Sequence, residues 1–187
     1  MSSDEEVVAT SIPYFIGKKE NIIQTRRVLK SVGGRDVLLI YHQGDFYAID
    51  ARCYHSGGPL QEGDIEVGCK KSLLIYICMP QICFNFKFSL LPIKDFDGRP
   101  CIVCPWHKYK ITLAEGEGLY QAVDPSVKPL KSTWCSKGIK QRIHTVTESN
   151  GDMFLTLNDS PGTIDSDYYQ TEKYRDTFLK EGPKKTK

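Results

Sequence analysis

The sequence predicts an all-β fold from three observations. Residues 37–41 form a short apolar and partly β-branched run, which suits a buried strand. Asn150 and Gly151 separate two further runs of this kind, and both residues tolerate the positive φ of a hairpin turn. Helical periodicity is hard to find anywhere in the chain, and the sequence contains no internal repeat.

The other predicted elements follow in chain order. Residues 22–29 are a strand candidate, and a turn at 42–45 joins the run at 37–41 to a second strand at 46–49. Residues 124–137 are rich in proline and serine and predict a loop. The last strand candidates are residues 139–147, whose second half alternates apolar and polar side chains, and residues 153–157.

Composition limits the possible classes of protein. The chain has 187 residues, of which 40% are hydrophobic and 26% charged, so one domain with an insertion or tail has enough apolar material for a core. A net charge of +2 is too weak to indicate a nucleic-acid partner. The most apolar stretch, 73–86, is interrupted by Pro80 and Gln81 and is shorter than the roughly 20 residues of a membrane-spanning helix. We therefore expect neither a nucleic-acid nor a membrane partner.

The first residues predict a cytoplasmic location. They read Met-Ser-Ser-Asp-Glu-Glu, whereas a secretory signal starts basic and then becomes apolar, and a mitochondrial transit peptide avoids acidic residues. Seven cysteines in such a compartment are expected to be mostly reduced. The useful question is then which of these cysteines bind a metal.

Residues 67–94 differ in composition from the rest of the chain. They contain neither Asp nor Glu and are dense in Leu, Ile, Phe and Cys, whereas acidic residues and glycine are common on both sides. Such a shift predicts an insertion. A retained intron and a tolerated surface loop are two explanations for it, and long surface loops add little closure entropy.

Two short motifs each combine a cysteine with a histidine. Cys53 and His55 are followed by Gly-Gly-Pro at 57–59, and Cys104 and His107 enclose Pro-Trp. A single cysteine is more often a small buried apolar residue, and a single histidine is more often structural. Two such pairs, one of them beside glycines that permit a sharp turn, favour a metal site instead. The four residues are therefore the candidate metal ligands.

On these two motifs the chain resembles the Rieske iron–sulfur family, particularly its small soluble ferredoxin-type members. The resemblance covers about residues 10–66 and 95–175. It implies an antiparallel β-sandwich with a smaller β subdomain that holds one [2Fe–2S] cluster per chain. It also implies that Cys53 and Cys104 bind the inner iron, and that His55 and His107 bind the outer, solvent-facing iron.

The chain departs from the pattern of Rieske proteins in two respects. Respiratory members carry a second cysteine in each loop and join the two in a disulfide, whereas Gly58 and Trp106 stand there in this chain. Lys108 and Tyr109 follow His107, where the family usually has glycine and then serine or an aromatic residue. The hydroxyl that raises the potential of respiratory members is therefore expected to be absent, and the potential is expected in the lower part of the Rieske range.

The resemblance also implies a domain organisation. Residues 1–160 form the iron–sulfur domain, with the insertion at 67–94, and residues 161–187 form a C-terminal extension with a partly disordered tail. Removing the insertion brings the spacing between the two motifs close to that of the family. The insertion is therefore expected to interrupt a turn between the two strands that carry the cluster loops.

The expected function is one-electron transfer between an unidentified reductase and an unidentified acceptor. A stand-alone enzyme is a weaker interpretation, because Rieske oxygenases need a second, larger domain with a mononuclear iron site. Lys108 and Lys110 follow the second motif and are expected to favour the reduced cluster, which carries one more negative charge. Two alternatives remain open. In the first, the same four residues bind one structural zinc ion, and the protein is an interaction module. In the second, the insertion prevents cluster assembly, and the chain is an inactive isoform.

Overall fold

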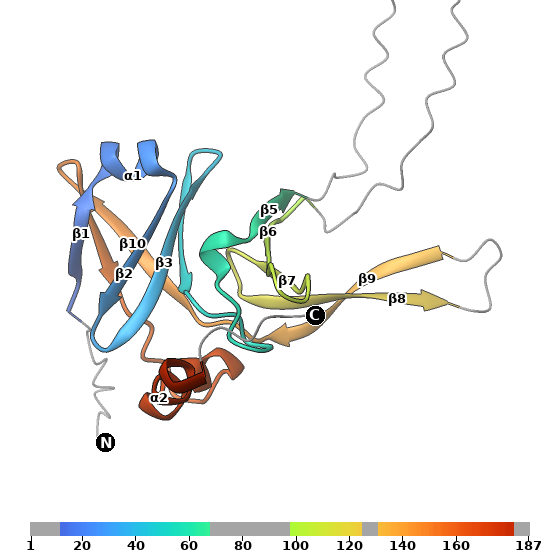
Figure 1. Cartoon of the computed structure of the whole chain (residues 1–187). Coiled ribbons are helices and arrows are strands. Elements are labelled where there is room, and N and C mark those ends of the chain that lie inside the picture. Colours follow the sequence, from blue (N-terminus) through green and yellow to red (C-terminus); the bar gives the residue numbers. More distant parts are fainter. Residues whose placement is uncertain (1–11, 68–97, 125–130, 182–187) are drawn as a thin grey trace, which may run out of the picture.

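The fold consists of two antiparallel β-sheets, as described by a computed structural model for residues 12–67, 98–124 and 131–181 (Figure 1). The strands of the six-stranded sheet are, in order of pairing, β1 (Tyr14–Lys18), β11 (Asp152–Thr156), β10 (Ile143–Ser149), β4 (Asp45–Asp50), β3 (Arg35–His42) and β2 (Arg27–Val32). Those of the five-stranded sheet are β5 (Asp64–Val67), β6 (Pro100–Val103), β7 (Lys110–Thr112), β8 (Glu117–Asp124) and β9 (Lys131–Ile139). The all-β prediction with two antiparallel units is confirmed.

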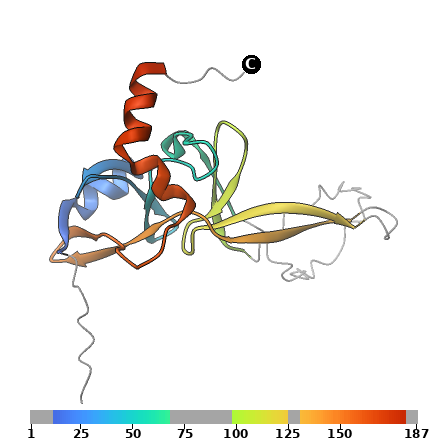
Figure 2. The ribbon, with the colours of Figure 1, turned by 90° about the horizontal axis from the view of Figure 1, so that it is seen from below.

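Helical segments are short and lie outside the two sheets. They are α1 (Lys19–Thr25), the 3₁₀ turns η1 (Leu60–Glu62) and η2 (Asp165–Gln170), and α2 (Glu172–Glu181). Figure 2 shows the β8–β9 hairpin projecting from one side of the molecule and α2 projecting in a different direction. None of the helices in the described ranges is long and apolar enough to cross a membrane.

Strand β3 explains the continuous apolar run that the sequence displays. Its side chains alternate between two buried clusters: Val37 and Leu39 pack in one, and Leu38 and Ile40 pack in the other. A strand that is buried on both faces needs apolar residues at every position, which is why this run does not alternate. The second cluster also contains Cys53 and Cys104, so one face of β3 packs in the same core as both motif cysteines.

Two predicted turns are confirmed. Gln43 and Gly44 join β3 to β4 with φ values of 52° and 99°. Asn150 and Gly151 join β10 to β11 with φ values of 52° and 80°, as the hairpin signal predicts.

Three predictions of local structure are wrong in part. Residues 22–29 are not one strand, because α1 runs to Thr25 and Arg26 turns the chain with a φ of 60° before β2. The isoleucines of this segment favoured a strand, but the buried Ile22 anchors the helix to the core. Residues 139–147 are interrupted between β9 and β10, where Gln141 and Arg142 turn inward and form side-chain hydrogen bonds.

The loop predicted at 124–137 is the third of these. Strand β9 begins at Lys131, and its polar residues pair with β8, for example Ser132 with Val123 and Thr133 with Ala122. Pairing with a partner strand outweighs the low intrinsic strand preference of serine, because strand preference depends strongly on context.

The apolar block lies almost entirely outside the described residues. Its first residue, Val67, ends β5 and pairs with Pro100 of β6. The two strands are antiparallel neighbours, so the chain from 68 to 99 connects the two strands of one hairpin. The C-terminal extension predicted at 161–187 is described as far as residue 181, where it contains η2 and α2.

Candidate metal centre

The first motif lies in a loop between β4 and η1. The Gly57 N–H donates to the Cys53 carbonyl oxygen at 2.8 Å, and the Cys53 N–H donates to the Gly58 carbonyl oxygen at 2.9 Å. Gly57 has a φ of +71°, which an L-residue rarely adopts. The glycines after the motif therefore close a tight loop, as their sequence predicts.

The second motif lies in a loop between β6 and β7 that is closed in the same way. The Lys108 N–H donates to the Cys104 carbonyl oxygen at 3.0 Å, and the Cys104 N–H donates to the Tyr109 carbonyl oxygen at 2.8 Å. In both loops the donor to the cysteine carbonyl is the fourth residue after the cysteine. That residue is Lys108 here, with a φ of 57°, and it takes the left-handed position that Gly57 has in the first loop.

The two cysteines of the motifs meet in the protein interior. Cys53 is 0% exposed and Cys104 is 2% exposed, and their thiols are hydrogen-bonded to each other. This hydrogen bond lowers the pKa of Cys104 to about 6 and raises the pKa of Cys53, which burial raises further. The Cys104 thiol is therefore expected to ionise before the Cys53 thiol. A thiolate, rather than a thiol, is the form that binds metal.

Two backbone amides donate hydrogen bonds to each cysteine sulfur. The N–H groups of His55 and Ser56 are hydrogen-bonded to the Cys53 sulfur, and those of Trp106 and His107 are hydrogen-bonded to the Cys104 sulfur. Such donors stabilise negative charge on sulfur. They belong to the two loops themselves, so the loop conformation supplies them.

The two histidines of the motifs lie on the outside of the same site. His55 and His107 are exposed, and their ring centroids are 5.0 Å apart. The Tyr109 ring stacks on His55 at 3.9 Å with an interplanar angle of 15°. Partial burial of the ring, the charge of His107 and the charge of Lys137 lower the pKa of His55, in that order, which favours the neutral imidazole that binds metal.

The chemistry of this donor set fits a two-iron cluster. The four candidate ligands lie as a buried thiol pair and an exposed imidazole pair, and a Rieske-type cluster needs one such pair on each iron. Among the described residues, no group of three or more His, Cys, Asp or Glu side chains is arranged to hold a metal ion. A Cβ on Gly58 would lie 2.6 Å from the Cys104 sulfur, so a larger residue there would require the sulfur or the loop to shift. That the four residues bind iron stays a prediction.

Gln141 supports the first loop and was missed by the sequence analysis. Its side chain is 0% exposed; its carbonyl accepts from the Tyr54 N–H at 3.0 Å, and its amide donates to the Asp50 and Arg52 carbonyls at 2.9 and 2.8 Å. It comes from the connection between β9 and β10. A buried glutamine with three hydrogen bonds has no local sequence signature that distinguishes it from a surface glutamine.

Two tyrosines of the C-terminal segment also contact the first loop. The Tyr169 hydroxyl donates to the His55 carbonyl at 2.9 Å, and the Tyr174 hydroxyl lies 3.5 Å from the Gly57 carbonyl. Their rings pack edge to face at 4.9 Å, and a Cβ on Gly57 would collide with the Tyr174 hydroxyl. The sequence shows that this segment is rich in tyrosine, but it does not show that these tyrosines contact the first loop.

Comparison with known proteins assigns this arrangement to a family. The family model of soluble Rieske-type ferredoxins matches residues 14–90 and 75–160. The human Rieske domain-containing protein is 48% identical over 160 residues, which cover 86% of this chain and 84% of the human protein.

Solved structures with a similar arrangement are more distant. The ferredoxin of carbazole 1,9a-dioxygenase from Nocardioides aromaticivorans has a TM-score of 0.43 and 16% identity, over 79% of this chain and all of that one. A complex of reduced oxygenase and oxidised ferredoxin in carbazole 1,9a-dioxygenase gives a TM-score of 0.45 and 16% identity, over 81% of this chain and 99% of that one. The family assignment rests on the two sequence matches.

Proposed function

This chain belongs to the soluble Rieske-type ferredoxin family, and we propose that it is a one-electron carrier with a single [2Fe–2S] cluster. The observation that carries this proposal is the pairing of two buried thiols behind two exposed imidazoles. Cys53 and Cys104 would hold the inner iron, and His55 and His107 the outer one. When bound, the cluster supplies reversible uptake of one electron.

The residues around the site favour this role. The four amide donors to the cysteine sulfurs stabilise the extra negative charge that arrives on reduction, whereas burial opposes it. The exposed imidazoles would bring the outer iron close to the protein surface, where a partner can exchange an electron with it. The amide donors would tune the potential of the cluster.

The partners we propose are a reductase and an electron acceptor that approach the imidazole edge. Lys137 lies beside this edge, with its Nζ 4.8 Å from the centroid of the Tyr109 ring that stacks on His55. The iron–sulfur unit we propose is residues 1–160, with 67–94 as an insertion and 161–187 as an extension, and the location we propose is the cytoplasm.

Absorption and EPR spectra of the anaerobically purified full chain, before and after dithionite, test the proposal. We expect a reddish-brown oxidised form and a reduced form whose EPR signal has the low average g of mixed thiolate and imidazole ligation. A colourless, EPR-silent protein with about one zinc per chain would contradict it and favour the structural zinc site. A colourless protein without metal would point to the insertion, and deleting residues 67–94 would then be expected to restore colour.

Changing the charge beside the second loop is expected to shift the potential. Lys108 is exposed and forms no ion pair within the described ranges, whereas Lys110 pairs with Glu66 at 2.5 Å. Lys108→Glu is expected to lower the midpoint potential by on the order of 30 mV, since it replaces an attraction for the reduced cluster by a repulsion. A redox titration followed by absorption measures this shift.

The neutral variant Lys108→Gln controls for the loss of the side chain itself. It is expected to give about half of the shift, because only one unit of charge is removed. An unchanged or higher potential in Lys108→Glu would show that this lysine does not favour the reduced form.

A further inference from the structure

One peptide group links the C-terminal segment to a sulfur of the candidate cluster site. The carbonyl of the His55–Ser56 peptide accepts the Tyr169 hydroxyl at 2.9 Å. The N–H of the same peptide, which belongs to Ser56, is hydrogen-bonded to the Cys53 sulfur. The phenol, the peptide and the sulfur thus form a chain of two hydrogen bonds in series.

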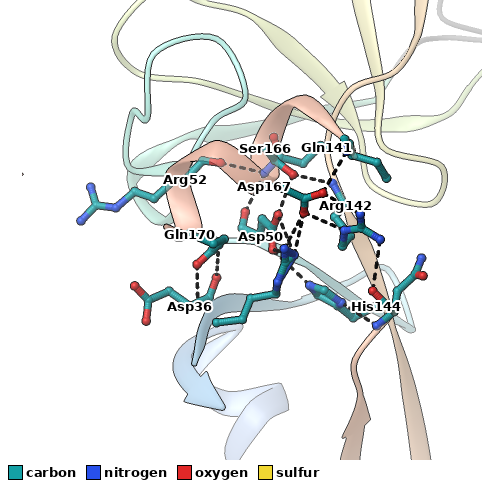
Figure 3. Close-up of polar contacts among 12 residues, drawn as sticks. Asp36, Asp50, Arg52, Gln141, Arg142, His144, Ser166, Asp167 and Gln170 are labelled. Atoms are coloured by element: carbon teal, nitrogen blue, oxygen red, sulfur yellow. Dashed lines mark hydrogen bonds and ion pairs between the residues drawn. The ribbon is translucent and has the colours of Figure 1, made fainter. Parts of the chain in front are cut away.

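The turn η2 that carries Tyr169 is firmly attached to the six-stranded sheet (Figure 3). The Asp167 carboxylate accepts from the Arg142 side chain, with Nη2 at 2.6 Å and Nε at 2.7 Å, and also from the Arg35 guanidinium. Burial alone would raise the pKa of Asp167, but these guanidinium groups and the Ile164 N–H lower it overall. Asp167 is therefore ionised and paired at neutral pH.

A second attachment lies next to the first. Ser166 is 0% exposed; its hydroxyl donates to the buried Asp50 carboxylate at 2.6 Å and accepts from the Arg142 N–H at 2.9 Å. At the other end of η2, the Gln170 side-chain amide exchanges two hydrogen bonds with the Asp36 backbone at 2.9 and 3.0 Å. These contacts fix the position of η2 on both sides of Tyr169, so the phenol is directed at the loop rather than free to rotate away.

Hydrogen bonds in series strengthen one another, because a peptide whose carbonyl accepts a hydrogen bond becomes a better N–H donor. A stronger N–H donor to a cluster thiolate favours the more negative, reduced state. We propose that Tyr169 is a positioning residue that raises the reduction potential of the cluster by polarising the His55–Ser56 peptide toward the Cys53 sulfur. This inference rests on the proposed function, since it concerns the cluster that these residues would hold.

If Tyr169 had a purely mechanical role, its removal would change the reduction potential in the opposite direction. If the phenol only held the loop closed, its removal would let water reach the cluster. Burial disfavours the charged form of a site, so greater access of water would raise the potential. The direction of the shift therefore separates polarisation of the peptide from simple bracing of the loop.

The test compares Tyr169→Phe with Tyr168→Phe in the full chain. Tyr168 packs against both Tyr169 and Tyr174, but its hydroxyl forms no hydrogen bond in the part of the chain that the structure describes. Each protein is titrated with dithionite as the electron donor and ferricyanide as the acceptor, one electron per cluster, and the fraction reduced is read by absorption and EPR. Iron content and the thermal midpoint are measured on the same samples.

We expect Tyr169→Phe to lower the equilibrium constant for reduction about twofold, which is a downward shift of about 18 mV at 59 mV per tenfold. Tyr168→Phe is expected to keep the wild-type value. An unchanged or raised potential in Tyr169→Phe, or an equal fall in Tyr168→Phe, would overturn the inference. A wild-type chain without any cluster would instead refute the proposed function itself, so the two failures are distinguishable.

Discussion

Replacing Cys104 by serine is expected to abolish the visible absorption and the EPR signal of the purified chain. Cys104 is 2% exposed and is hydrogen-bonded to Cys53, and the variant removes one of the two thiolates that would hold the inner iron. A serine hydroxyl has nearly the same shape but does not replace a soft thiolate as an iron–sulfur ligand. Iron and acid-labile sulfide per chain are expected to fall by at least about tenfold.

Two other cysteines provide matched controls for this loss. Cys101 lies on β6, three residues before Cys104, and is also fully buried, and burial raises the pKa of its thiol to about 12. It is therefore an inert thiol at neutral pH, and Cys101→Ser is expected to keep the cluster, as is Cys135→Ser on β9. Circular dichroism of each variant checks that the fold persists. A full cluster in Cys104→Ser, or equal loss in Cys101→Ser, would refute the assignment of the ligands.

Asp50→Ala is expected to lower the free energy of unfolding by about 3–5 kcal/mol. The Asp50 side chain is 0% exposed and accepts hydrogen bonds from three groups: the Ser166 hydroxyl at 2.6 Å, the His144 Nε2 at 3.2 Å and the Arg35 guanidinium at 3.3 Å. The Asn158 N–H donates to His144 Nδ1 at 3.1 Å, so Nε2 carries the proton that His144 donates to Asp50. Removing the carboxylate leaves these donors buried without an acceptor.

Urea denaturation followed by circular dichroism measures this loss. Asp45→Ala is the control, because Asp45 begins the same strand and is exposed, and its replacement is expected to change stability by less than about 0.5 kcal/mol. A change of less than about 1 kcal/mol in Asp50→Ala would show that the network in Figure 3 contributes little to stability.

The sequence predicts those features that depend on neighbouring residues. Positive φ at Asn150 and Gly151, and the tight loop after Cys53, follow from residues only a few positions apart. The apolar run at 37–41 predicts a buried strand because burial on both faces requires apolar side chains at each position. The cysteine and histidine motifs are visible for the same reason, since each pair of candidate ligands lies within one loop.

Other features required the tertiary structure. Strand β9 exists because β8 pairs with it, and the short helix α1 forms although its isoleucines favour a strand. The support of the candidate site comes from far along the chain: Gln141 reaches Tyr54 across 87 positions, and Tyr169 reaches His55 across 114.

Local patterns therefore predicted the all-β class and the four candidate ligands of this chain. The contacts of Asp50, Gln141, Asp167 and Tyr169 were decided only by the folded structure. The physical reason is that a hydrogen bond depends on distance and direction in space. Sequence periodicity records which face of an element is buried, but it carries no information on which distant donor or acceptor that face will meet.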